Sequence, residues 1–506
     1  MNSSPDTGDS LTDKTRRSVA WTTLASVLAK VVALGAQLVF ARFLAPEAYG
    51  LLALVGSIGA VLAVLQQGGL TQVLISRPRR IQSLLGVATS TSVILGSILA
   101  GAVTIASPWL AQAFDESQLI VALPCFALSI FFASAGAPAQ AFLQAKFRFW
   151  EISVLEIVSA ILRAVLSAVF IVLGFDELSL IIPIPIVALV NSVAGWKVAG
   201  IKPLMKFSRR SMSALIVAGM PLAAAQLVLL ATWHGDYVIV QSFLDTGTLG
   251  IYFLAFNLST QFFLLISQNA SRVLFAGLSQ LSLEPIRQTA AFVRAAKDLA
   301  SLAFPISFLQ VLLADPGVKI LFKEQYHGMI PIIQILSIGL AFRCVGSPAG
   351  ALLQSRRKFS RLFVLNCIYS TFFLVAVCVG TAVFGVIGTA CAATSYFVLL
   401  GPVHILASVA KPGELVRETF QIFIGPTVSA SIALVVAMFV QSVSASVMYD
   451  VLAAFVATVV FTIGYCVISY LAFPQNLDAW NRHSKSFRSR LGQIWSQRRA
   501  ARGSSQ

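Results

Sequence analysis

Apolar runs of about 19 to 25 residues recur along the chain, and short polar or charged segments separate them. A run of about 20 apolar residues is long enough to cross the hydrocarbon core of a membrane as an α-helix. The pattern therefore predicts about fourteen transmembrane helices. The predicted spans lie at roughly 19–43, 49–67, 84–106, 118–142, 151–173, 178–200, 212–233, 249–270, 293–313, 327–347, 361–383, 386–408, 418–440 and 448–472.

The composition narrows the class of protein further. Hydrophobic residues make up 57% of the 506 residues and charged residues 11%, against about 25% charged residues in an average globular domain. These values exclude a water-soluble enzyme and a disordered chain, and they disfavour a β-barrel, whose strands alternate polar and apolar positions. The predicted fold class is an all-α polytopic membrane protein. The six cysteines lie in apolar runs without metal-ligand spacing, so we expect no metal and no cofactor.

The charged residues predict the orientation of the chain. Nearly all lysines and arginines fall in the two terminal segments and in every second loop. The other loops hold Arg42, Lys319 and Lys323 as their basic residues, together with acidic residues that include Asp236 and Asp315. Because basic loops stay in the cytoplasm, both termini are predicted to be cytoplasmic. The net charge of +16 therefore reflects orientation and does not indicate nucleic acid as a partner.

The second half of the chain resembles the first. An offset of about 200 aligns Phe43, Leu44 and Gly50 with Phe243, Leu244 and Gly250. An offset of about 210 aligns residues 136–144 with residues 346–354, which share Gly, Pro, two Ala, Leu and Gln. Each repeat contains about six helices, an even number, so the two repeats are predicted to be parallel and related by an axis along the membrane normal.

The repeat predicts the organisation of the chain. Residues 1–18 form a cytoplasmic segment, and two six-helix lobes at 19–205 and 206–410 surround a central cavity. Two extra helices lie at 411–473, and a basic cytoplasmic tail at 474–506. The tail fits an amphipathic helix on an anionic leaflet, and a disordered basic tail fits it equally well. Parallel lobes around a cavity suit a transporter that works by alternating access.

Charged residues inside predicted spans are candidate site residues, because charge in hydrocarbon is costly. Lys30 shares a helix face with Gln37, and Glu156 shares one with Arg163 seven residues later. Arg343 lies near the cytoplasmic end of its span. Two alternatives stay open at this stage. The first is that Glu156 only neutralises Arg163 within a helix bundle. The second is that Lys30 and Arg343 extend their charged groups to the membrane surface and bind no ligand.

These candidates indicate the chemistry of a cargo. Their charge is mostly positive, so a cavity that they line favours an anion, and a diphosphate suits both arginine and lysine. The neutral stripe that includes Asn257 and Gln261 suits sugar hydroxyl groups. Asp236 follows His234 at the outer end of the seventh span, so Asp236 and Glu156 are candidates for coupling to H⁺ or Na⁺. No motif for ATP hydrolysis is found.

Several motifs resemble those of bacterial polysaccharide flippases, the polysaccharide transporters of the multidrug/oligosaccharidyl-lipid/polysaccharide superfamily. The resemblance lies in Phe43-Leu-Ala-Pro-Glu-Ala-Tyr-Gly-Leu-Leu52, Gly68-Gly-Leu70, Gln144-Ala-Lys-Phe-Arg148, Leu244-Asp-Thr-Gly-Thr-Leu-Gly250 and Gln354 with its basic loop. It covers most of the chain, and the colanic-acid and succinoglycan exporters look most similar.

The resemblance implies two six-helix lobes and two peripheral helices. It also implies movement of an undecaprenyl-diphosphate-linked oligosaccharide from the cytoplasmic to the outer leaflet. The expected partners are this lipid-linked oligosaccharide, the bilayer, and a polysaccharide polymerase with export machinery. The resemblance implies no enzyme activity. Two alternatives remain, namely a cation-coupled multidrug antiporter of the same superfamily and a polysaccharide polymerase or ligase.

Overall fold

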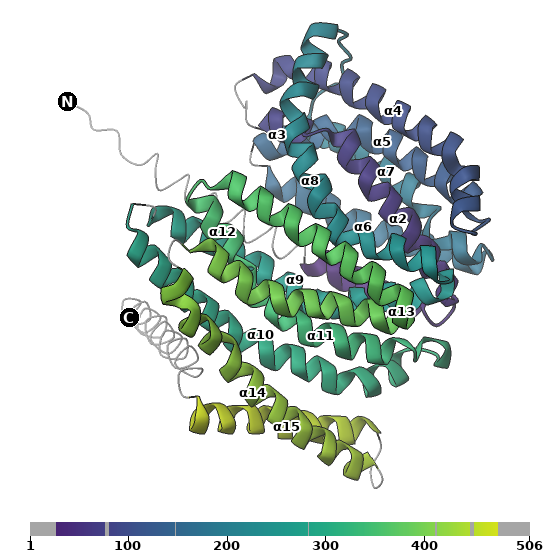
Figure 1. The fold of residues 1–506 in the computed structure, drawn as a ribbon. Coiled ribbons are helices and arrows are strands. Elements are labelled where there is room, and N and C mark those ends of the chain that lie inside the picture. The colour runs from purple at the N-terminus through teal and green to yellow at the C-terminus, as the bar shows by residue number, and fades with distance from the viewer. Residues whose placement is uncertain are drawn as a thin grey trace, which may run out of the picture. The chain divides into compact units, whose positions relative to one another are not determined.

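The structure, a computed structural model, describes residues 27–75, 80–146, 148–281, 283–409, 412–445 and 450–473. All regular elements in these ranges are helices (Figure 1). The first, Val27–Phe40, precedes α2 (Pro46–Gln67), α3 (Leu70–Ile75), α4 (Ile81–Ala113), α5 (Leu119–Ala145), α6 (Phe149–Val172), η1 (Asp176–Leu180), α7 (Pro183–Ala199) and α8 (Arg209–Phe243). The others are α9 (Thr246–Gln280), α10 (Pro285–Leu321), η2 (Glu324–Tyr326), α11 (Met329–Gly346), α12 (Pro348–Ser355), α13 (Phe359–Ser408), α14 (Pro412–Ala445) and α15 (Asp450–Ala472).

The helices confirm the predicted fold class. In the part of the chain that the structure describes, eleven helical segments are long and apolar enough to cross a membrane. The shorter helix Val27–Phe40, the helix α9 and a second limb of α13 account for the other three predicted spans. Each predicted apolar run therefore contains a helix, and the protein is a multi-pass, all-α membrane protein.

The helix α13 consists of two limbs that meet at Gly385 (Figure 1). Gly385 has φ +61° and ψ −146°, a conformation open to glycine and strained for other residues. The hydroxyl oxygens of Thr381 and Thr389 lie 2.7 Å apart, whereas eight residues of straight helix would separate them by about 12 Å along the axis. The chain thus reverses at Gly385, between the two spans predicted at 361–383 and 386–408.

Several helices are longer than their apolar runs. The helix α8 continues to Phe243, and α10 covers residues from Pro285 to Leu321. Placing Asp236, Asp315 and Lys319 in loops was therefore wrong, because all three lie in the last turns of helices, and their outer location stays a prediction. Charged residues can extend a helix beyond the hydrocarbon core, since backbone hydrogen bonding continues there without apolar side chains.

The described residues form two compact units. The first includes the chain up to Leu254, together with Leu321–Gly328 and Val377–Thr389. The second includes Ala255–Ile320, Met329–Ala376 and the chain from Ala390. In the first unit α8 packs on α2, α3 and α4. The lobe boundaries at residues 205 and 410 stay a prediction, and segments 1–18 and 474–506 lie outside the described residues.

The two copies of the repeated glycine motif contact each other within the first unit. A Cβ atom added to Gly50 would overlap the carbonyl oxygen of Thr246, and one added to Gly250 would overlap the carbonyl oxygen of Pro46. The first turns of α2 and α9 therefore cross backbone to backbone. A side chain on either glycine would separate the two helices.

Polar contacts at this crossing follow the same pattern in both copies. The Tyr326 hydroxyl donates to the Leu44 carbonyl oxygen over 3.0 Å. The Thr246 hydroxyl donates to the Glu116 carboxylate over 2.5 Å. Glu116 and Tyr326 are 210 residues apart, the offset that aligns residues 136–144 with 346–354. The loop before α5 thus binds the start of α9, and the loop before α11 binds the chain just before α2.

The glycine crossing predicts a difference between two alanine substitutions in α2. Gly50→Ala should lower the free energy of unfolding by about 1–3 kcal/mol, because its methyl group overlaps the Thr246 backbone. Gly56→Ala should leave stability unchanged or raise it, because nothing lies within 4 Å of the added Cβ and alanine favours a helix. Thermal unfolding midpoints in detergent measure both effects. Equal midpoints for the two variants would contradict the backbone contact.

Candidate functional site

The helix α6 exposes two chemically different faces. The exposed apolar side chains recur at helical spacing on one face, at Val154, Val158, Ile161, Val165 and Val169. Glu156 and Arg163 are also exposed, but with 3.6 residues per turn they lie on the opposite face. Between these two faces, α6 packs against α5, α7 and η1.

The charged face of α6 cannot border lipid at low cost. Among the described residues no ion pair joins Glu156 to Arg163, and seven residues of helix separate them by about 10 Å along the axis. The predicted neutralisation of Arg163 by Glu156 is therefore not a direct ion pair. Intramembrane charges face a protein interior or a water-filled cavity. We therefore expect the apolar face to border lipid and the exposed face with Glu156 and Arg163 to border a hydrated space.

The helix Val27–Phe40 carries two more predicted site residues. Lys30 and Gln37 are both half-buried, while Val31 and Val39 are exposed on other faces. The Tyr49 hydroxyl donates to the Gln37 carbonyl oxygen over 2.9 Å and so ties this helix to α2. Lys30, Glu156 and Arg163 all belong to the first unit.

Arg343 on α11 is held between aromatic side chains in the second unit. Its guanidinium carbon lies 5.1 Å from the centre of the Phe263 ring and 4.6 Å from that of Phe397. These distances are those of cation–π contacts, which fix a guanidinium in place without neutralising its charge. The two phenylalanines come from α9 and α13, so spacing along α11 could not have revealed them.

Asn257 and Gln261 lie on α9 in the same unit as Arg343. Both are half-buried, and they are one helical turn apart. The predicted site residues therefore fall into two groups. The first unit holds Lys30, Gln37, Glu156, Arg163 and Asp236, and the second holds Asn257, Gln261 and Arg343.

Asp236 is fully buried on α8, about 10 Å along the axis from the end of the helix. Its carboxylate accepts a hydrogen bond of 2.9 Å from the Tyr252 hydroxyl and one of 3.0 Å from the Tyr237 backbone amide. The Tyr237 ring also packs edge-on against the rings of His234 and Tyr252. Asp236 was paired with His234 on the basis of sequence, and Tyr252 was missed because only the fold brings it to the carboxylate.

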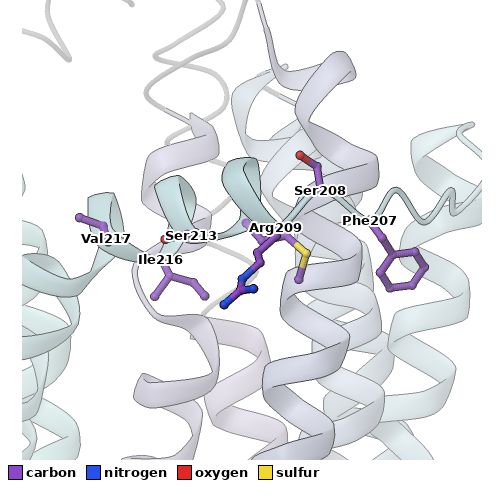
Figure 2. Close-up of a pocket in the computed structure, with 7 residues that line it drawn as sticks. Phe207, Ser208, Arg209, Ser213, Ile216 and Val217 are labelled. Atoms are coloured by element: carbon purple, nitrogen blue, oxygen red, sulfur yellow. The ribbon is translucent and has the colours of Figure 1, made fainter.

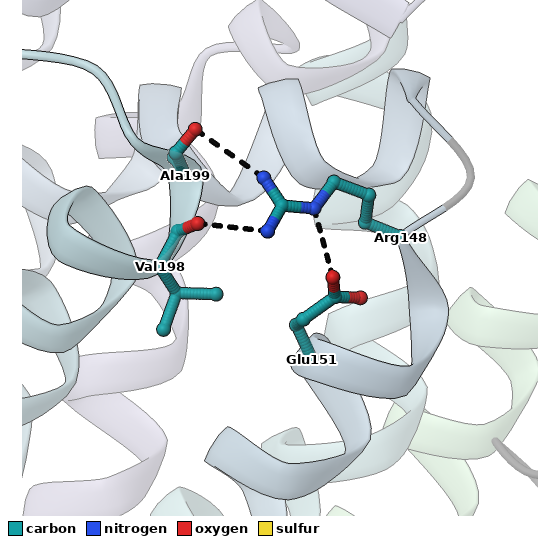
Figure 3. Close-up of polar contacts among 4 residues, drawn as sticks. All are labelled: Arg148, Glu151, Val198 and Ala199. Atoms are coloured by element: carbon teal, nitrogen blue, oxygen red, sulfur yellow. Dashed lines mark hydrogen bonds and ion pairs between the residues drawn. The ribbon is translucent and has the colours of Figure 1, made fainter.

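Two loop arginines have structural roles that the sequence did not suggest. Arg148 donates to the carbonyl oxygens of Val198 (2.9 Å) and Ala199 (3.3 Å), and its Nε lies 2.9 Å from the Glu151 carboxylate (Figure 3). The last carbonyl groups of a helix have no partner within the helix. Arg148 therefore caps the C-terminus of α7 and joins it to the start of α6.

Arg356 performs the same task in the second unit. It donates to the Ser408 carbonyl oxygen at the end of α13 over 3.3 Å. It also donates to the Gln288 side-chain oxygen and the Thr289 hydroxyl, each over 2.8 Å. Arg148 and Arg356, which follow α5 and α12, therefore cap helix ends in addition to their predicted role in orienting the chain.

An open pocket of about 450 Å³ lies at the start of α8 in the first unit (Figure 2). It is mainly apolar, and Arg209 is the charged residue among the side chains that line it. Ser208, at its edge, caps α8 by accepting a hydrogen bond of 3.4 Å from the Ser211 amide. The other lining residues are Phe207, Met212, Ser213, Ile216 and Val217.

Comparison with known proteins identifies the family. Residues 39–331, more than half of the chain, match a family model described as polysaccharide biosynthesis protein. The chain belongs to this polysaccharide biosynthesis protein family. The predicted resemblance is thereby confirmed at the level of the family.

Several relatives are similar over much of their length. The lipopolysaccharide biosynthesis protein WzxC of Escherichia coli is 24% identical over 408 residues, which are 78% of this chain and 82% of WzxC. The succinoglycan biosynthesis transport protein ExoT of Rhizobium meliloti is 24% identical over 64% of this chain and 65% of ExoT. The teichuronic acid biosynthesis protein TuaB of Bacillus subtilis is 24% identical over 54% of this chain and 57% of TuaB.

Solved structures share the fold of this family member. The lipid II flippase MurJ in an inward closed conformation matches with a TM-score of 0.73 and 16% identity, over 90% of this chain and 99% of MurJ. An inward-facing multidrug resistance MATE transporter matches with a TM-score of 0.63 and 14% identity, over 78% of this chain and 96% of the transporter. At these identities the likeness concerns the fold alone.

The two faces of α6 predict different reactivity of introduced cysteines. In a chain without its native cysteines, Glu156→Cys and Arg163→Cys should react with a maleimide at least about tenfold faster than Val158→Cys and Val165→Cys. The reason is that maleimides react with the thiolate, which forms in water and not in lipid. The measurement is labelling in intact membranes, with a denatured sample as the control for total thiol. Equal labelling of all four positions would contradict a hydrated charged face.

Proposed function

We propose that this protein is a flippase for a lipid-linked oligosaccharide. Its cargo is an undecaprenyl-diphosphate-linked repeat unit of an exopolysaccharide, capsule or O-antigen, which it moves from the cytoplasmic to the outer leaflet by alternating access. It works in the bacterial inner membrane with both termini in the cytoplasm. The exposed charged face of α6 is the observation that carries this proposal, because a membrane helix needs such a face only beside a polar passage.

The chemistry of the site residues supports an anionic cargo. Arg163 is exposed on that face without an ion pair to Glu156, and a guanidinium binds phosphate through two parallel hydrogen bonds. Lys30 adds a second positive charge in the same unit. Their proposed role is to attract the diphosphate at the cytoplasmic side.

The second unit supports binding of the glycan. Arg343 is held by Phe263 and Phe397, and an aromatic surface beside a cation suits the apolar and hydroxylated faces of a sugar ring. Asn257 and Gln261 supply carboxamides that both donate and accept hydrogen bonds. We assign the glycan to this group and the diphosphate to Lys30 and Arg163.

The comparisons agree with this cargo class. The family is one of polysaccharide biosynthesis, ExoT is named as a succinoglycan transport protein, and MurJ, which shares the fold, as a lipid II flippase. Partners on the outer side, in this proposal, are a polysaccharide polymerase and the export machinery.

A multidrug antiporter is the alternative function with structural support, because MATE transporters share the fold and Asp236 is a buried carboxylate. Drug susceptibility of a deletion strain separates the two functions. Altered susceptibility with normal surface polysaccharide would favour the antiporter. A polymerase or ligase would instead lengthen glycan in vitro, and no relative named above supports that activity.

Arg163→Gln should reduce flipping of the lipid-linked oligosaccharide by about tenfold or more, because a charge-assisted hydrogen bond contributes about 1.5–3 kcal/mol. Lys30→Gln should act in the same direction. The measurement is surface polysaccharide in cells, followed by flipping in vesicles that contain the purified protein. Lys202→Gln, a charge change at an exposed residue between α7 and α8, is the matched control and should transport normally.

Normal export by both Arg163→Gln and Lys30→Gln, at a normal amount of protein in the membrane, would remove these residues from the mechanism. Loss of export by Lys202→Gln as well would show that net charge matters and not the position of the cation.

We further propose that Asp236 couples transport to a cation gradient, with H⁺ as the leading ion and Na⁺ as the alternative. A carboxylate buried beside Tyr252 and Tyr237 can bind a proton or lose one to a change in hydration. Glu156 is exposed to the hydrated face of α6, so it is the second candidate for this role.

Asp236→Asn should abolish stimulation of flipping by an imposed pH gradient while basal flipping persists, because asparagine keeps the hydrogen bond from Tyr252 but does not ionise. Flipping in vesicles with and without a gradient measures this difference. Tyr252→Phe, which keeps the carboxylate, should retain gradient stimulation with an altered pH profile. Full stimulation of Asp236→Asn by a pH gradient and by a Na⁺ gradient would exclude Asp236 as the coupling group.

A further inference from the structure

The second unit contains a cavity of about 470 Å³ that the transport mechanism does not use. It lies where four helices end or begin at one face of the membrane. Its lining comes from the last turns of α10 and α14 and from the first turns of α11 and α15. In the proposed orientation this face is the outer one, at the level of the lipid head groups.

The helix α14 packs on α10 and α11 through an aromatic contact, and the cavity lies beyond this contact, toward the ends of the helices. The rings of Phe304, Phe342 and Phe423 join the three helices, with centroid distances of 5.0 to 6.4 Å. Phe304 and Leu312 are eight residues apart on α10, so the cavity begins about 12 Å along the axis from this aromatic contact.

The walls of the cavity combine opposite charges. Lys319 Nζ lies 2.9 Å and 3.0 Å from the two oxygens of the Asp315 carboxylate, one helical turn away. The Lys319 side chain is 53% exposed and that of Asp315 44% exposed. Each charged group can therefore accept a further partner on its open side.

Two carboxamides face the same cavity. They belong to Gln334 on α11 and Gln441 on α14, and both residues are half-buried. Within the described ranges neither amide has a hydrogen-bond partner. Half-buried amides without protein partners favour a polar ligand, because a ligand that can donate and accept hydrogen bonds meets their hydrogen-bonding capacity. Apart from Ser442, the remaining wall is apolar, at Leu312, Pro316, Ile320, Ile330, Met438 and Ala453.

We propose that this cavity binds the head group of phosphatidylethanolamine. The lipid ammonium donates hydrogen bonds to the Asp315 carboxylate, and the lipid phosphate accepts from Lys319 and from the glutamine amides. The apolar wall contacts the glycerol and the first methylenes of the acyl chains. A zwitterion matches both charges of the ion pair, whereas an anionic head group supplies no cation for the open side of Asp315.

Head-group selectivity distinguishes this ligand from other lipids. Phosphatidylethanolamine should bind the purified, delipidated protein about tenfold more tightly than phosphatidylcholine, because a quaternary ammonium cannot donate hydrogen bonds to Asp315. It should also bind more tightly than phosphatidylglycerol with the same acyl chains. Native mass spectrometry of the full chain with each lipid measures these affinities.

Substitutions test the named residues. Lys319→Gln and Asp315→Asn should each weaken phosphatidylethanolamine binding by about tenfold through loss of a charge-assisted contact. Gln441→Leu should weaken phosphatidylethanolamine binding less, by about threefold. Because this variant leaves the ion pair intact, it tests the cavity even where the charge variants fold poorly. Arg287→Gln is the matched control, since it removes an exposed ion pair with Glu284 at the other end of α10 and should leave binding unchanged.

Equal binding of phosphatidylglycerol, or full binding by the Lys319, Asp315 and Gln441 variants, would overturn the proposal. Competition by water-soluble glycerophosphoethanolamine as strong as that of the lipid would overturn the assignment to a membrane lipid and indicate a soluble or glycan-borne phosphoethanolamine. The measurement needs no transport, so its outcome is independent of the flippase proposal.

Discussion

The structure depends on one constraint, which is that hydrocarbon tolerates neither unpaired backbone groups nor isolated charge. The first part of this constraint makes every described regular element a helix. The second part decides which face of each helix meets lipid. On α6 the two requirements can be seen separately, with valines and isoleucine on one exposed face and Glu156 with Arg163 on the other. This division is the basis on which a polar passage is proposed, and it requires no knowledge of the cargo.

Packing between the helices uses means other than the hydrophobic effect, which lipid largely removes. Small residues allow close approach, as at the crossing of Gly50 with the Thr246 backbone and at the contact of Gly346 with Gly401. Arginines at the ends of helices satisfy carbonyl groups that would otherwise lack partners, as Arg148 does for α7 (Figure 3). Helix ends and glycine contacts thus hold each unit together.

Much of the fold could be predicted from the sequence, because membrane thickness turns span length into a direct signal. Even the reversal at Gly385 was visible as a gap between two apolar runs. The site was only partly predictable. Spacing revealed that Glu156 and Arg163 share a face, because both lie on one helix. It could not reveal Tyr252 beside Asp236, since that contact joins different helices.

The crossing of α2 and α9 has a consequence for the synthesis of the protein. Gly50 and Gly250 are 200 residues apart, and each helix packs against the backbone of the other. At a translation rate of about 5–20 residues per second, the start of α2 enters the membrane about 10–40 s before its partner exists. During that interval the α2 backbone surface is open to lipid and to other nascent helices. The crossing can therefore form only after about half of the chain has been made.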